Sequence, residues 1–167
     1  MSDWHPTVGD PIVAWRVWSV EEDERSGLRF LRSIHYGVRW PRRRPMRAHC
    51  IEQWRRGQPT IDLQPHQAPS AAGTHACGIH ALKEAEGTNS WLATAGADAT
   101  KVIGSVALWG RVALHEGGYR AEFAYPLDLL VLQPTPEWVD AEEVALKLAD
   151  GYGVPAQAGL PAHSHVS

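Results

Sequence analysis

Apolar residues recur at alternate positions along residues 101–132, and this is the clearest pattern in the chain. Alternation of this kind is typical of strands that bury one face. The pair Gly117–Gly118 divides the stretch and has the flexible backbone that a tight turn needs. We therefore expect one antiparallel hairpin at the centre of a sheet, bent at Gly104 and Gly110, because interior glycines favour bulges.

The first part of the chain carries shorter patterns. Residues 12–18 alternate β-favouring side chains and predict a strand. Residues 28–34 fit either a short strand or a short helix. Two prolines and a run of arginines predict an exposed loop or an extended segment over residues 36–45. Residues 48–56 have the pattern of one or two helical turns.

Two helices are predicted further along the chain. Residues 77–86 have a helical composition, and Gly87 is placed to stop that helix. The second helix follows Thr135, whose hydroxyl is a suitable N-terminal cap, and its end is expected at Gly151 or Gly153.

Together these elements predict an α+β fold that is β-dominated. We expect a small, partly closed antiparallel sheet or barrel with two or three short helices. A chain of 167 residues fits one domain. We assign residues 1–154 to a single globular domain and residues 155–167 to a flexible C-terminal tail.

Composition narrows the class of protein. No apolar run approaches the roughly 18–20 residues that span a bilayer, so we expect no membrane partner. The first residues lack the basic and apolar regions of a secretory signal. The chain holds 2 cysteines, too few for a disulfide framework. We therefore expect a cytoplasmic protein whose cysteines bind metal, react as thiols or fill the core.

Charge is unevenly spread, although the net charge is only −3. Residues 39–56 contain seven arginines and one acidic residue, whereas residues 121–167 contain seven acidic residues and one lysine. A basic segment with tryptophans in it predicts a site for nucleic acid or another anionic ligand. The alternative is a solvated basic loop balanced by the acidic half of the chain.

The candidate ligand-binding residues are Arg42, Arg43, Arg44, Trp40 and Arg120. Arg120 would anchor a carboxylate or phosphate if its strand face lined the mouth of a barrel. Trp109, beside a glycine, is expected in the core rather than in contact with a ligand.

Cysteine and histidine gather between residues 49 and 80. Zinc binds thiolate and imidazole ligands, usually four in a tetrahedron. A loop as long as residues 57–74 is uncommon unless something fixes it. We therefore predict zinc, although the spacing matches no standard zinc finger and a small buried Cys77 is the alternative. The predicted ligands are Cys50, His66, His75 and Cys77, with His49 and His80 as substitutes.

The same residues also fit an enzyme. At a helix N-terminus the Cys77 thiol would be activated as a nucleophile, with His75 or His115 as the base. Three protein ligands and a water would instead make the metal catalytic.

Three segments carry a resemblance to a known family. They are "CGIHA" at 77–81, "GSVALWGRV" at 104–112 and "HEGGYRAEFAYP" at 115–126. They resemble a family of small uncharacterised actinobacterial proteins with C-x-C-G-I, V-x-G-x-V-x-L-W-G and G-Y-R-A segments. The resemblance implies no activity. It places His75 where that family has its first cysteine, and an exchange of cysteine for histidine is typical of a zinc ligand.

These patterns lead us to expect a zinc-stabilised cytoplasmic binding module that recognises an anionic partner, nucleic acid first. One alternative is a small-molecule enzyme that uses Cys77 or a metal-bound water. The other is a protein–protein adaptor without chemistry.

Overall fold

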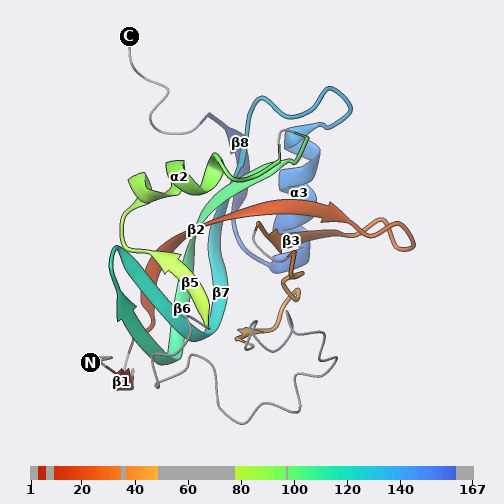
Figure 1. The fold of residues 1–167 in the computed structure, drawn as a ribbon. Coiled ribbons are helices and arrows are strands. Elements are labelled where there is room, and N and C mark those ends of the chain that lie inside the picture. The colour runs from red at the N-terminus through yellow and green to blue at the C-terminus, as the bar shows by residue number, and fades with distance from the viewer. Residues whose placement is uncertain (1–3, 7–9, 35–36, 49–77, 97, 161–167) are drawn as a thin grey trace, which may run out of the picture.

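The computed structural model describes residues 4–6, 10–34, 37–48, 78–96 and 98–160 of the chain. Its strands are β1 (Trp4–Pro6), β2 (Ile12–Glu22), β3 (Arg29–Ser33), β4 (Met46–Arg47), β5 (Ile79–Leu82), β6 (Lys101–His115), β7 (Gly118–Leu132) and β8 (Ala156–Gly159). Its helical segments are the 3₁₀ helix η2 (Ala85–Gly87) and the α-helices α2 (Thr88–Leu92) and α3 (Ala141–Tyr152). Figure 1 shows α3 against β8, and it also contacts β3 and β7, whereas α2 contacts β2.

The predicted central hairpin is confirmed. Strands β6 and β7 pair antiparallel from His115↔Gly118 at the turn to Val102↔Val131 at the far end. The register shifts twice along the hairpin, once beside each interior glycine of β6. A Cβ atom at Gly104 would collide with the carbonyl oxygen of Asp128, so only glycine allows the two strands to approach there.

The strand pairings also form a closed circuit. β2 pairs with β6, β6 with β7, β7 with β5, and β5 returns to β2 through the single partner pair Trp15↔Leu82. Strands β1, β3 and β4 extend the sheet at its edges, all antiparallel. Strand β8 runs parallel to β7, so the sheet is mixed. The fold class is thus α+β and β-dominated, as predicted, with one parallel pair that the sequence pattern did not indicate.

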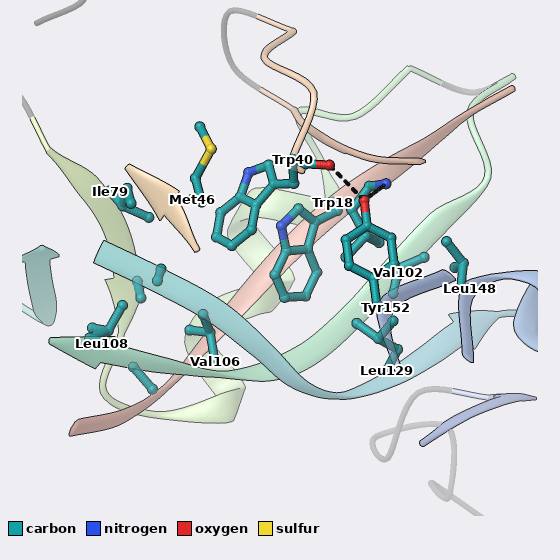
Figure 2. Close-up of a cluster of buried hydrophobic side chains, with 14 of the residues drawn as sticks. Trp18, Trp40, Met46, Ile79, Val102, Val106, Leu108, Leu129, Leu148 and Tyr152 are labelled. Atoms are coloured by element: carbon teal, nitrogen blue, oxygen red, sulfur yellow. Dashed lines mark hydrogen bonds between the residues drawn. The ribbon is translucent and has the colours of Figure 1, made fainter. Parts of the chain in front are cut away.

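Large aromatic side chains fill the core between the sheet and α3. Trp18 and Trp40 meet edge to face with ring centroids 5.3 Å apart. The Tyr152 hydroxyl donates to the Trp40 carbonyl oxygen at 2.8 Å and accepts from the Leu31 N–H at 2.8 Å (Figure 2). Burial raises the pKa of Tyr152 to about 12, so this hydroxyl remains a neutral donor. Tyr152 thus links α3 to β3 through Leu31, and to the segment after β3 through Trp40.

Helix α3 begins later than predicted. Asp140 is its N-terminal cap, accepting from the N–H groups of Glu142 at 3.0 Å and Glu143 at 3.4 Å. Thr135 is not the cap, because its hydroxyl donates to the Val139 carbonyl oxygen in the turn before the helix. The predicted end is confirmed at Gly153, which has a φ of +69°.

The helix predicted for residues 77–86 is wrong. Residues Ile79–Leu82 form strand β5, in which Ile79 and Ala81 are buried and their neighbours half-buried. Gly78 has a φ of +122°, which is incompatible with a right-handed helix at that position. Pairing with β7 and β2 therefore overrides the helical propensity of this segment.

The structure also tests several predictions that depend on shorter sequence patterns. Residues 28–34, which fitted a strand or a helix, contain β3. The predicted tail begins too early, because Ala156–Gly159 lie in the sheet as β8. The predicted loop over residues 36–45 is only partly exposed, since Trp40 within it is 1% exposed. The helical turns predicted for residues 48–56 fall almost entirely outside the described residues.

Candidate functional site

The face of the sheet opposite Trp18 carries a row of aromatic and basic side chains. Trp109 on β6 is the register partner of Phe123 on β7, and Phe123 is the partner of Arg47 on β4. Directly opposed residues of neighbouring strands lie on one face, so these three form a row across the sheet. Trp109 and Phe123 are half-exposed and Arg47 is exposed. We call this row the aromatic row.

Local backbone geometry positions the two rings of the aromatic row. Their centroids are 6.0 Å apart and their planes are inclined by 20°, a stacked arrangement. Gly110, with a φ of +76°, follows Trp109 at the second register shift. A Cβ atom there would lie 2.8 Å from the Phe123 ring and 2.7 Å from the Glu122 carboxylate. The missing side chain at Gly110 therefore leaves the space that the Phe123 ring uses.

Apolar surface continues from the aromatic row along the same face. Val13 on β2 is opposite Ala107 on β6, two residues from Trp109. Residues two apart in a strand share a face, and Val13 is 58% exposed. The row thus belongs to a wider apolar strip with a guanidinium group at one end.

The arginine run at 42–44 serves the fold more than a ligand. Arg43 donates from its backbone N–H to the Tyr125 hydroxyl at 2.9 Å and from its guanidinium to the Asp150 carbonyl oxygen at 2.6 Å. It also adopts a φ of +58°, unusual for a residue other than glycine. Arg42 lies against the end of α3, where a Cβ atom at Gly151 would collide with its guanidinium. Arg43 therefore binds the carbonyl end of that helix, where positive charge is favourable, and Arg42 packs beside it.

The remaining described arginines of this segment differ in whether they form ion pairs. Arg39 binds Glu21 at 2.9 Å and Asp23 at 3.6 Å, and its hydrogen bond lowers the pKa of Glu21. Across the part of the chain that the structure describes, Arg44 and Arg47 form no ion pair and are exposed. Among the described arginines of this segment, Arg44 and Arg47 are thus exposed with neither an ion pair nor a hydrogen bond to the end of α3.

The structure does not bring together the other predicted ligand-binding residues. Trp40 is buried in the core and its indole N–H donates to the Ser33 hydroxyl at 3.0 Å, so its ring has no exposed face for a ligand. Arg120 is 9% exposed on β7, opposite His80 of β5 and Ala113 of β6.

The predicted metal ligands lie outside the described residues, so zinc stays a prediction. Within the described ranges, no three or more His, Cys, Asp and Glu side chains are grouped to hold a metal ion. His80, a substitute ligand, lies on β5 and is half-buried. The segment after Cys77 is a strand, which removes the helix N-terminus that would have activated that thiol. For His115 only the backbone, at the end of β6, is described. The residues outside the description are Cys50, His66, His75, Cys77 and His49.

Sequence reasoning missed Phe123 and Arg47 as site residues and placed Trp109 in the core. The alternation in β6 and β7 contains the signal, because Trp109 and Phe123 become register partners once the turn is placed at Gly117. The pairing of Arg47 with Phe123 joins residues 76 positions apart, and no local pattern indicates it.

Comparison of the chain with protein-family models, curated proteins and solved structures found no match. The resemblance to the actinobacterial family is therefore a prediction still. Among the helices of the described residues, none combines the length and apolar character needed to cross a membrane.

Proposed function

We propose that the protein is a binding module for an anionic partner, single-stranded nucleic acid first, and that the aromatic row is its contact surface. The cross-strand register of Trp109, Phe123 and Arg47 carries the proposal. Proteins that bind single strands combine aromatic side chains, on which bases stack, with cationic groups that contact the phosphates. The half-exposed ring pair and the exposed guanidinium supply both on one sheet face.

The proposed contact surface differs from the ligand-binding site that we predicted from the sequence. Arg42 and Arg43 contact the end of α3, and Trp40 lies in the core. Arg44 stays a candidate phosphate contact, because it is exposed and precedes β4, the strand that carries Arg47. A cytoplasmic location and zinc at Cys50, His66, His75 and Cys77 remain parts of the proposal.

A titration with labelled oligonucleotides tests the proposal. Wild-type protein should bind short single-stranded DNA or RNA more tightly than a duplex of the same length, as measured by fluorescence anisotropy. Phe123→Ala should weaken binding by about 1–3 kcal/mol, roughly 5- to 150-fold, the usual contribution of one stacked base. Arg47→Ala should flatten the slope of log affinity against log salt by about 0.7 for each phosphate that the variant no longer neutralises.

Two matched variants serve as controls. Trp138→Ala removes an aromatic side chain that is 76% exposed outside the aromatic row. Arg25→Ala removes an exposed arginine in the turn after β2. Both should bind like wild type. Equal losses in Arg47→Ala and Arg25→Ala would indicate a general charge effect, and equal losses in Phe123→Ala and Trp138→Ala would show that the aromatic row is not a specific contact surface. No binding by wild type at low salt would reject the proposal in favour of an enzyme or an adaptor.

A further inference from the structure

A second cationic group lies on the opposite side of β2, inside the fold. Arg16 is 8% exposed, and its guanidinium carbon lies 5.0 Å from the Trp40 ring centroid and 5.7 Å from the Trp91 ring centroid. Its Nη1 donates to the His80 carbonyl oxygen, and its Nη2 donates to the Ser33 hydroxyl oxygen at 3.0 Å. The guanidinium thus lies over two indole rings and donates from two of its three nitrogens.

Among the described residues, no acidic side chain neutralises the charge of Arg16. No carboxylate of the described residues lies within ion-pair distance of it. Burial lowers the pKa of Arg16 to about 10, so the group still carries its charge near neutral pH. Two indole faces offset part of the cost of burying this charge, but buried charges in proteins are normally paired.

One edge of the guanidinium is also short of an acceptor. The Nε atom of Arg16 is buried and has no hydrogen-bond partner in the described part of the chain. Nε and Nη2 form the edge that binds carboxylates and phosphates through two parallel hydrogen bonds. Ser33, next to Nη2, accepts from both Arg16 and the Trp40 indole, and its own hydroxyl hydrogen is donated to no described acceptor. Two donors therefore lie beside a buried positive charge, and the described residues offer no acceptor for either.

We propose that Arg16 and Ser33 form a binding site for a small oxyanion, the carboxylate or phosphate group of a small molecule. The anion accepts from the Arg16 Nε–H and Nη2–H edge and from the Ser33 hydroxyl, while the His80 carbonyl holds the other end of the guanidinium. Trp91, half-exposed on the five-residue helix α2, places its ring 5.7 Å from the guanidinium carbon.

This site is independent of the aromatic row. Side chains alternate between faces along β2, so Arg16 and Val13 point to opposite sides of the strand. A ligand on one face touches none of the residues that carry the other proposal. An experiment can therefore reject one of the two proposals without rejecting the other.

Anion titration of the ¹⁵N-arginine-labelled protein tests the oxyanion site directly. Acetate and inorganic phosphate are added separately at constant ionic strength, balanced with chloride, and the Arg16 Nε–H resonance and tryptophan fluorescence are followed. Saturable changes in both signals are expected with at least one anion. A response to acetate alone identifies a carboxylate site, and a response to phosphate alone identifies a phosphate site. Responses that fail to saturate with either anion, into the millimolar range, would overturn the proposal.

Variants connect the response to the two donors. Arg16→Lys keeps the charge but loses the planar edge, and Ser33→Ala loses one donor; each should weaken anion binding about tenfold, as expected for a lost hydrogen bond to a charged group. Phe123→Ala should leave anion binding unchanged, and Arg16→Lys should leave oligonucleotide binding unchanged. If Arg16→Lys does not fold, the wild-type titration still decides the question. Anion binding of wild-type strength in a folded Arg16→Lys variant would overturn the assignment.

Discussion

The two faces of the central sheet use aromatic residues in different ways. On the core face, Trp18 and Trp40 are 0% and 1% exposed and meet edge to face. On the opposite face, Trp109 and Phe123 lie nearly parallel and stay half-exposed. Tyr152 of α3 packs over the Trp18–Trp40 pair. Its hydroxyl accepts from the Leu31 N–H of β3 and donates to the Trp40 carbonyl oxygen. Aromatic side chains on this scaffold are therefore structural or available to a ligand according to what packs over their face.

The largest expected effect compares one aromatic residue from each face. Trp40→Ala should lower the free energy of unfolding by about 3–5 kcal/mol, because it leaves a cavity in a packed core. Phe123→Ala should cost only about 1 kcal/mol, because a half-exposed ring buries less apolar surface. Urea denaturation of both variants measures the difference. Similar losses in the two variants would show that Phe123 belongs to the core and is not a surface residue.

A smaller effect concerns the hydroxyl that closes the core face. Tyr152→Phe should cost about 1–3 kcal/mol, because the Leu31 N–H loses its acceptor and the Trp40 carbonyl loses its donor. No matching hydroxyl closes over the Trp109–Phe123 pair, so this loss is specific to the core face within the described structure. Denaturant unfolding near neutral pH measures it.

The pKa of Tyr152 adds a pH dependence with a definite sign. Because its pKa is raised from 10.0 to about 12 in the folded protein, the unfolded chain releases this proton first as the pH rises. The contribution of Tyr152 to the free energy of unfolding should be fully present below pH 10 and be lost between pH 10 and about 12. The loss should be of order 2 kcal/mol. Tyr152→Phe should remove that part of the decline. An identical pH profile in wild type and variant would contradict the raised pKa.

The smallest expected effect tests how the exposed face is built. Gly110→Ala should cost about 1–2 kcal/mol, because it adds backbone strain and displaces the Phe123 ring. Gly117→Ala is a matched control, since Gly117 has a nearly identical φ of +77° but open space around the added Cβ atom. Gly110→Ala should therefore be the less stable variant and should alone weaken oligonucleotide binding. Equal behaviour of the two would mean that the Phe123 ring does not depend on Gly110.

Local sequence patterns correctly predicted the parts of the fold that depend on residues close together in the chain. The hairpin of β6 and β7 follows from period-two alternation around a glycine turn, and its partners lie a short distance apart in the sequence. The end of α3 follows from Gly153, which can adopt the left-handed conformation at low cost. The start of α3 was misplaced because Thr135 and Asp140 both have the side chain of a cap, and only the backbone path distinguishes them.

The candidate site was predicted less well than the fold. Seven arginines in residues 39–56 indicated a basic surface, but an arginine count does not distinguish a guanidinium that contacts a helix end, like Arg43, from one that faces solvent, like Arg47. No sequence pattern distinguishes Arg16, because its environment is made by residues from β3, β5 and α2 that the chain brings together only on folding.

The sequence by itself determined the β-dominated class, the central hairpin and the final turn of α3, because each depends on side-chain period or backbone freedom within a few residues. The tertiary structure alone decided that Ile79–Leu82 is a strand, since hydrogen bonds to β7 outweigh a helical propensity that is small for each residue. It also decided which tryptophans of the described residues are buried and which of their arginines form ion pairs. Both depend on contacts between residues distant in the chain, and burial and charge pairing have no local signature.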